Sequence, residues 1–182
     1  MQKLLAWTLQ AIREESSDFS WMEEYRFEWT PLVSNAISRI IEGQSVLILT
    51  DPHSRWFGHY IQHKINDMHK NRPFLPFYQL RKLFVSLDDI HSVQELQLVE
   101  DMLDISYPNG YIIWYIGRGD HPCTKIAFKK DDSFLWIIDD QVQNSFPLRG
   151  SDPQLDIKLL QLFKLFDSTL SAALFGNLEI AL

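Results

Sequence analysis

The segment 45–51, read as SVLILTD, constrains the fold more than any other part of the chain. Its four consecutive apolar residues, 46–49, leave no polar face, so a strand with this sequence must be covered on both sides. Gly43 is placed to end a helix before this strand, and Ser54 is placed to begin a helix after it. A helix, a buried strand and a second helix form the opening unit of a parallel α/β sheet, whose ligands bind beyond the carboxyl ends of the strands. Residues 50–54 are therefore the first place to look for a functional site.

Four more apolar runs read as strands. The runs YIIWYI at 111–116 and FLWII at 134–138 are continuous and predict buried central strands. The run at 73–78 contains prolines, which confine a strand to the edge of a sheet. This edge position agrees with the flavodoxin-like strand order 2-1-3-4-5. The fifth run, near 146–148, predicts a short edge strand, and residues 82–90 are ambiguous between helix and strand.

The N-terminal part is expected to be helical. Apolar spacing predicts a first helix over 4–12. A second helix carries the aromatic residues Trp21, Tyr25 and Trp29 on one stripe, which packs either on the core or on another subunit. The pair Thr30-Pro31 is typical of a helix start, with a capping oxygen followed by proline in the first turn. We therefore expect a third helix to begin there and to run to the glycine at 43.

Two helices are expected in the second half of the chain. Ser92 and Glu95 form a capping box. The helix that follows should turn a set of apolar residues inward: Leu96, Val99, Met102 and Leu103. Between 141 and 150 the chain is too short for a crossover with a long helix, so we expect mainly a loop there.

The longest helix is expected to begin at 151–153 and to reach about Phe175. Its apolar residues spread around a wider arc than a one-sided surface helix needs. Either the helix is buried within the domain, or its end, with Leu170, Leu174 and Phe175, meets another subunit. We take these residues together with the aromatic pair at 21 and 25 as candidates for an oligomer or partner interface.

The pattern as a whole predicts one α/β domain over residues 1–182. It divides into N-terminal helices (1–43), a β/α core (44–150) and a long C-terminal helix with a tail (151–182). The expected architecture is a three-layer α/β/α sandwich around a mostly parallel sheet of about five strands. Hydrophobic residues make up 46% of the 182 residues, which excludes a disordered chain.

The ends of the expected strands offer polar side chains, of which the carboxylates and the arginine could hold a metal ion and a phosphate. They are Asp51, His53, Arg118, Asp120, His121, Asp139 and Asp140. A phosphosugar- or nucleotide-handling enzyme is therefore the alternative function. However, a phosphate cradle needs small residues after the first strand, and 50–56 reads TDPHSRW, without glycine. We accordingly expect no catalytic residue and no cofactor.

Metal binding is not expected either. His59 and His63 lie four residues apart on a helix, but no glutamate stands between them as in a HExxH motif. They also lie nearly opposite the apolar stripe of that helix. Two solvated histidines are the simpler interpretation.

The overall composition narrows the function further. Seventeen basic residues stand against 24 acidic ones, a net charge of −7, so we expect no direct DNA binding. The single cysteine, Cys123, cannot form an intrachain disulfide, which favours a cytoplasmic location. No apolar run approaches the roughly 20 residues of a membrane helix, so no membrane association is expected.

Three stretches carry a resemblance to a known family: the opening at 4–37, the SVLILTD strand and the ending SAALFGNLEIAL at 171–182. Together they resemble the HobA family, the DnaA-associating proteins of the Helicobacter and Campylobacter group, over the whole chain. The resemblance implies a sugar-isomerase-like (SIS-like) fold, self-association (expected here as a homotetramer) and binding to the N-terminal domain of the replication initiator DnaA.

It further implies no enzymatic role and no cofactor. The expected function is therefore that of a non-enzymatic adaptor that promotes assembly of DnaA at the chromosome origin. Sugar-isomerase domains proper carry a Gly/Ser-rich loop after the first strand, which this chain lacks. The resemblance does not indicate which residues contact DnaA.

Overall fold

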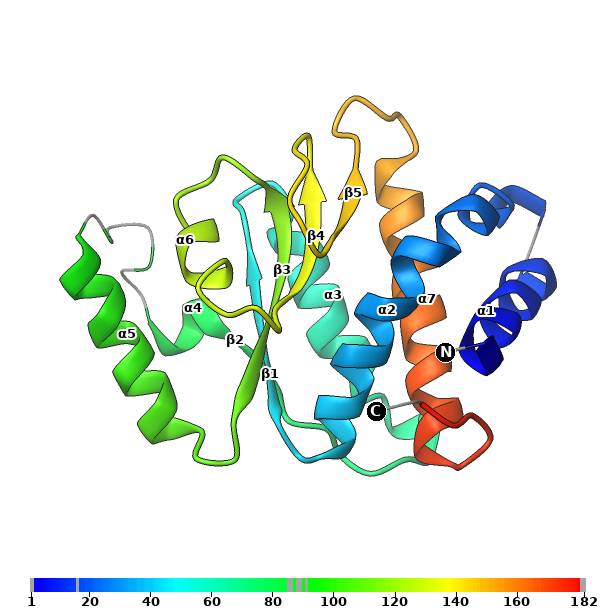
Figure 1. Ribbon diagram of the computed structural model, residues 1–182, viewed down its shortest axis with the longest axis horizontal. Coiled ribbons are helices and arrows are strands. Elements are labelled where there is room, and N and C mark those ends of the chain that lie inside the picture. Colours follow the sequence, from blue (N-terminus) through cyan, green and yellow to red (C-terminus); the bar gives the residue numbers. More distant parts are fainter. Residues whose placement is uncertain (1, 16, 85–86, 88–89, 91, 181–182) are drawn as a thin grey trace.

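The computed structural model of the chain describes residues 2–15, 17–84, 87, 90 and 92–180, and shows helices on both faces of a five-stranded sheet (Figure 1). The strands are β1 (Ser45–Thr50), β2 (Phe77–Gln79), β3 (Tyr111–Arg118), β4 (Phe134–Ile138) and β5 (Ser145–Leu148). They lie in the order β2-β1-β3-β4-β5, and every neighbouring pair is parallel. The predicted three-layer sandwich and flavodoxin-like order are confirmed.

The described helices divide between the two faces of the sheet. They are α1 (Gln2–Glu15), α2 (Met22–Ile41), α3 (Arg55–Ile65), α4 (Leu80–Leu83), α5 (Val93–Ser106), α6 (Thr124–Ala127) and α7 (Leu155–Leu174). One face is covered by α1, α2, α3 and α7, and the other by α4, α5 and α6. No helix in the described part of the chain is long and apolar enough to cross a membrane.

The strands supply both faces because successive side chains point to opposite sides of a sheet. In β3, Trp114 and Ile116 enter the cluster beneath α2, α3 and α7, whereas Ile113 and Tyr115 enter the cluster beneath α5 and α6. The central strands are therefore apolar throughout, as the continuous runs predict.

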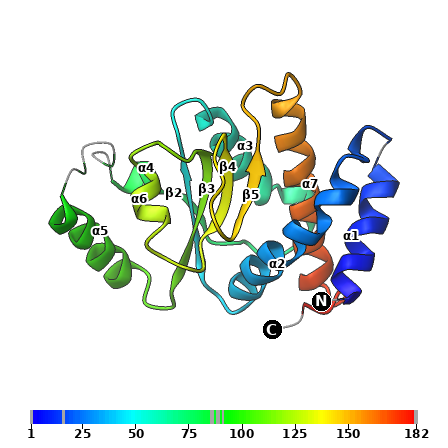
Figure 2. The same ribbon diagram turned by 45° about the horizontal axis from the view of Figure 1, so that its top comes forward.

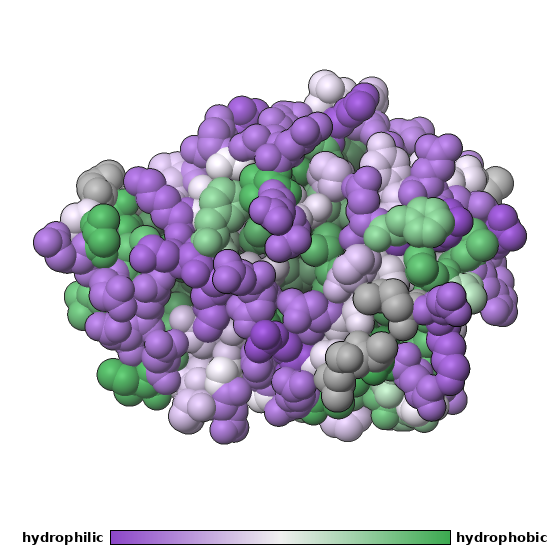
Figure 3. All heavy atoms as spheres, viewed as in Figure 1, coloured by the Kyte–Doolittle hydropathy of each residue, from purple (hydrophilic) through white to green (hydrophobic). Residues whose placement is uncertain are grey.

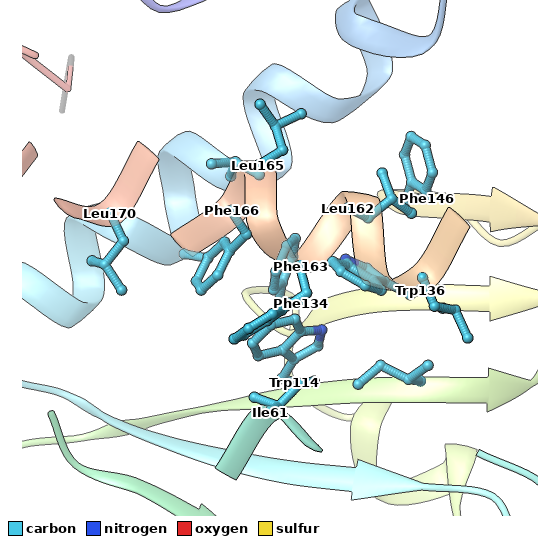
Figure 4. Close-up of a cluster of buried hydrophobic side chains, with 14 of the residues drawn as sticks. Ile61, Trp114, Phe134, Trp136, Phe146, Leu162, Phe163, Leu165, Phe166 and Leu170 are labelled. Carbon is cyan, nitrogen blue, oxygen red and sulfur yellow. The ribbon is translucent and has the colours of Figure 1, made fainter. Parts of the chain in front are cut away.

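The larger cluster is rich in aromatic side chains (Figure 4). The ring centroids of Trp114 and Trp136 lie 5.1 Å apart, and Phe166 of α7 lies 4.8 Å from Trp114. Trp29 of α2 reaches the same group, 5.5 Å from Trp136. These rings join two helices to the two middle strands, so this face supplies most of the packing that holds the domain together.

Helix α2 departs from the prediction, because it runs without a break through Pro31. The expected helix start at residues 30–31 is therefore wrong. Proline removes only one intrahelical N–H donor, and the hydroxyl of Thr30 donates to the Arg26 carbonyl oxygen at 2.6 Å. Trp29 and Val33 on either side of the proline are fully buried. Burial of this continuous face outweighs the local preference for a new helix.

Two further segments can be compared with the prediction, the connection between β4 and β5 and the stretch 82–90. The connection from β4 to β5 has only the six residues 139–144, with positive φ at Asp139 and Asn144, and β5 is an edge strand, as expected. Within the ambiguous stretch 82–90, residues 82–83 form the end of α4, while 85, 86, 88 and 89 lie outside the described residues.

The capping box of Ser92 and Glu95 is present at the start of α5. Leu96 and Leu103 are buried as predicted, but Met102 is 44% exposed, so its predicted inward position is wrong. Helix α5 packs on the sheet along a narrower arc than its apolar spacing indicates.

Helix α7 lies between the sheet layer and α1 in both views (Figures 1 and 2). Leu162 and Phe166 belong to the cluster on the sheet, and Leu165 and Leu170 are also buried. Much of the wide apolar arc of α7 is thus covered by its own chain.

Arg72 fastens the segment before β2 to α7. Its side chain is 2% exposed and donates to Asp167 Oδ1 at 2.6 Å, to Ser171 Oγ at 2.8 Å and to the carbonyl oxygen of Ile65. Asp167 also pairs with Lys70 at 2.7 Å. A buried guanidinium depends on a paired carboxylate such as Asp167, because no water can take the place of that partner in the interior.

We predict that Asp167→Ala lowers the free energy of unfolding by about 3–5 kcal/mol, because Arg72 would remain buried and unpaired. Urea denaturation measures this change. Lys164→Ala, which removes an exposed pair with Glu15, is the matched control and should change little. Equal effects of the two substitutions would show that the Arg72 pair is not a structural fastening.

Candidate functional site

The carboxyl ends of β1, β3 and β4 lie side by side, and they bring together Asp51, Arg118 and Asp139. Asp51 directly follows β1 and is 1% exposed. Its Oδ1 accepts a hydrogen bond from the Ser54 backbone N–H at 2.7 Å, and its Oδ2 accepts one from the Arg118 backbone N–H at 2.9 Å. Both oxygens are therefore used to join the loop after β1 to the end of β3.

Gly117 allows this contact. A Cβ atom at position 117 would lie 2.7 Å from Cγ of Asp51, closer than side chains approach in folded proteins. Glycine is required here because the β3 backbone passes directly against the carboxyl group. The close approach leaves no room for a ligand between Asp51 and β3.

Helix α3 begins at Arg55, and the N–H groups at such a helix start are a common binding site for phosphate. Here the carboxyl group of Asp51 occupies the Ser54 N–H, just before the first turn. Pro52 has no N–H to offer, and the side chain of Ser54 makes no capping bond. An internal side chain thus takes the position in which a phosphate would be held.

Arg118 lies at the rim and holds two carboxyl groups. It binds both oxygens of Asp120, at 3.1 and 3.0 Å, and reaches Asp139 Oδ2 at 3.4 Å. Asp139 Oδ1 in turn accepts the Gly150 backbone N–H at 2.7 Å. The acids that the alternative enzymatic function would use are engaged with the chain itself.

Three side chains at these strand ends, Asp120, Arg118 and Tyr115, have pKa values shifted further from neutral pH. The hydrogen bond with Arg118 lowers the pKa of Asp120, and that same bond raises the pKa of Arg118. Burial raises the pKa of Tyr115, whose hydroxyl donates to the Arg118 carbonyl oxygen at 2.8 Å. A general acid or base needs a pKa near the working pH, and these three shifts all lead away from it.

A cavity of about 310 Å³ remains beside these residues. His53 and Trp56 line it from the loop after β1 and from α3, and Asp139 and Asp156 line it from the other side. Arg118 also lines it, but its guanidinium is already bound by Asp120 and Asp139. In the described part of the chain, no group of three or more His, Cys, Asp or Glu side chains is arranged to hold a metal ion.

The other side chains noted from the sequence do not join this group. Asp140 accepts the backbone N–H of Gln141 at 2.8 Å, and His121 Nδ1 accepts that of Cys123 at 3.3 Å. The thiol of Cys123 is buried, 3.1 Å from an Arg81 guanidinium nitrogen. These contacts are structural.

A larger hollow of about 580 Å³ lies next to the strand ends, and Trp21 and Tyr25 line it. Their rings meet edge to face with centroids 5.9 Å apart, and Trp21 Nε1 donates to Gln161 at 3.0 Å. Lys158 Nζ lies 4.7 Å above the Trp21 ring and 2.5 Å from Asp152. Trp21 and Tyr25 are thus partly covered and open to the hollow on one side, whereas Trp29 of the same stripe is fully buried in the core.

Sequence reasoning singled out the two aromatic residues but missed the hollow. Its walls come from the start of α2, the start of α7 and residues 139–141 and 147–149. Only the tertiary arrangement brings these segments together, so no local pattern signals it.

The other candidate interface residues lie at the end of α7. Leu170 is fully buried in its own chain, Leu174 is half-buried, and Phe175 is 54% exposed. Beside them, a cavity of about 490 Å³ runs between α1 and the residues that follow α7, with Trp7 in its wall. Of this group, Phe175 and Leu174 are available to a second molecule.

Comparison with known proteins identifies the family. The family described as "HobA: DNA replication regulator" matches residues 1–180. The chain belongs to the HobA family. It is 26% identical to the DNA replication regulator protein HobA of Helicobacter pylori over 186 residues, which cover 99% of this chain and 100% of that protein.

Two solved HobA structures have the same fold as this chain. The fold matches HobA in a crystal structure of a HobA–DnaA (domain I–II) complex from Helicobacter pylori, with a TM-score of 0.77 and 27% identity, over 96% of this chain and 97% of that one. HobA crystallised from the same organism matches with a TM-score of 0.75 and 25% identity, over 96% of both chains. The similarity thus covers the whole HobA fold.

We predict that Asp51→Asn lowers the free energy of unfolding by about 1–3 kcal/mol, because the amide NH₂ would face one of the two backbone donors and leave it unpaired. Thermal and urea denaturation test this. Asp120→Asn, at an exposed carboxyl group bound to the same arginine, is the control and should leave stability nearly unchanged. An unchanged stability of the Asp51 variant would contradict its structural role.

Proposed function

We propose that this chain is an adaptor that binds the N-terminal domain of the replication initiator DnaA. The observation that carries this proposal is the match to HobA in the HobA–DnaA (domain I–II) complex, at a TM-score of 0.77 over 96% of the chain. A shared fold over this length and a shared family support a shared partner. In this proposal the protein works in the cytoplasm and promotes assembly of DnaA at the chromosome origin.

A non-enzymatic role is part of the proposal. Relatives of the chain are named as regulators of DNA replication. The strand ends, where an α/β enzyme of this type would bind its ligand, are tied by Asp51 to Ser54 and Arg118. The alternative, an enzyme for phosphosugars or nucleotides, would need these backbone donors free.

Self-association gives the adaptor its mechanism. An assembly with several copies of one docking surface holds several DnaA molecules close together, and so raises their effective concentration for one another. We propose a homotetramer, in line with the family resemblance. Exposed Phe175 and half-buried Leu174 supply one contact between copies, beside the cavity between α1 and the tail.

The aromatic hollow beside the strand ends is the second part of this proposal. Trp21 and Tyr25 present half-open rings there, a type of residue enriched in the centres of protein interfaces. We propose that this hollow contributes to the contact with DnaA or with another copy. No direct binding to DNA is proposed, since the net charge of −7 opposes it.

Isothermal titration with domain I–II of the DnaA from the same genome tests the adaptor function. We expect saturable binding to this fragment and none to a DnaA fragment that lacks domain I. The C-terminal part of DnaA serves as the control for nonspecific association. Binding that depends only on the DNA-binding part of DnaA, or no binding at all, would contradict the proposal.

We predict that Phe175→Glu lowers the mass of the assembly in light scattering and leaves the fold intact, because an interface would have to bury an unpaired charge. Phe74→Glu is the matched control, since Phe74 is 80% exposed and lies elsewhere on the surface. An unchanged mass for Phe175→Glu would place the contact between copies somewhere other than the end of α7.

A further inference from the structure

Helix α5 carries two apolar stripes, and the described residues of the chain cover only one of them. Leu96 and Leu103 are buried against the second face of the sheet. Leu98, Met102 and Ile105 lie four and three residues apart, so they share another face of the helix. Their exposed fractions are 60%, 44% and 81%.

The position of α5 makes this second stripe accessible. The helix lies at one end of the molecule, at the far side from α1 and α7 (Figure 1). Hydrophobic side chains are visible at the surface over α5 (Figure 3). Three neighbouring aliphatic side chains on one open helix face are characteristic of a docking surface.

The charge around the stripe has one sign. Helix α5 contains four acidic residues and no basic one. Helical spacing places Glu95 on one side of the stripe and Asp101 on the other. Asp101 and Asp104 also lie towards the C-terminal end of the helix, where carboxylates oppose the helix dipole, and the last turn of α5 itself has no basic residue.

We propose that the stripe of Leu98, Met102 and Ile105 docks an amphipathic helix of a partner protein, with lysine or arginine on both sides of its own apolar stripe. The partner's apolar side chains would cover the three aliphatic residues. Its cationic side chains would reach Glu95 and Asp101, one on each side of the stripe.

A second copy of this chain fits the stripe less well. Two α5 helices that pack antiparallel about a two-fold axis near Met102 would bring Asp101 close to Asp101 of the other copy. Neither helix has a basic residue to separate these charges. The proposed surface is also distinct from the strand ends and from the end of α7, and it stands whether or not the chain binds DnaA.

Two synthetic peptides test the proposal against the full-length protein. One is a helix of about 18 residues with a leucine stripe flanked by lysine, long enough to be helical once bound. The other has glutamate in place of every lysine. Fluorescence anisotropy at moderate salt should show binding of the basic peptide and none of the acidic peptide.

Matched variants then locate the binding. Leu98→Ser with Ile105→Ser should lower the affinity for the basic peptide by at least about tenfold, because the complex loses two buried aliphatic contacts. Met68→Ser with Phe74→Ser removes two equally exposed apolar side chains elsewhere and should change nothing. Asp101→Lys reverses one flanking charge at a position where a basic residue favours the helix, and it should weaken binding of the basic peptide.

Two results would overturn the proposal. Equal affinity of the basic peptide for the wild-type protein and for the variant without Leu98 and Ile105 would show that the stripe is not the site. Light scattering of the same variant gives the second result. If the substitutions lower the mass of the assembly, a second copy of the chain covers the stripe instead.

Discussion

The functional interpretation depends on one buried carboxyl group. Asp51 accepts the backbone N–H groups of Ser54 and Arg118, and so ties the loop after β1 to the end of β3. In a parallel α/β sheet this is the place where the strand order reverses and where ligands usually bind. With both donors used internally and Gly117 packed directly against the carboxyl group, the space between Asp51 and β3 is filled, and a cavity of about 310 Å³ remains beside it. This internal use of the donors and the match to a family of replication regulators both favour recognition on the outer surfaces.

The two faces of the sheet are built differently, and this bears on where partners can bind. The face beneath α2, α3 and α7 holds the aromatic cluster around Trp114 and Trp136, with the helices packed closely over it. The opposite face is covered by the four-residue helices α4 and α6 and by α5, of which only Leu96 and Leu103 are buried. The first face supplies stability. The second face leaves α5 with an open apolar stripe. Because the chain belongs to a family of replication regulators, this stripe is a reasonable place to look for protein contacts.

Much of the fold could be predicted because its strands are locally unambiguous. The SVLILTD run has no polar face, so its central place followed from local chemistry. The edge position of β2 was predicted correctly, but the strand covers Phe77–Gln79 and not 73–78, so the prolines taken as its edge signal lie before it. The continuity of α2 could not be predicted, because the packing of Trp29 and Val33 against the sheet overrides the signal of Pro31. The exposure of Met102 depends on how much of α5 the neighbouring elements cover, which spacing alone does not show. The absence of glycine from the loop after β1 indicated that this loop does not cradle a phosphate. It did not show that Asp51 binds the backbone of Arg118, because the two residues lie far apart in the chain.

The central claim is that the strand ends are closed by Asp51 and that recognition takes place elsewhere. Residue-resolved hydrogen exchange tests it most directly, because the amides of Ser54 and Arg118 report on the two hydrogen bonds. We expect both amides to exchange as slowly as the buried amides of β1 and β3, with no change on addition of sugar phosphates or nucleotides. Binding of DnaA domain I–II should slow exchange at the outer surfaces and leave these two amides unaffected. Fast exchange at Ser54 and Arg118 that slows when a sugar phosphate is added would contradict the account, since it would show an open and functional anion site.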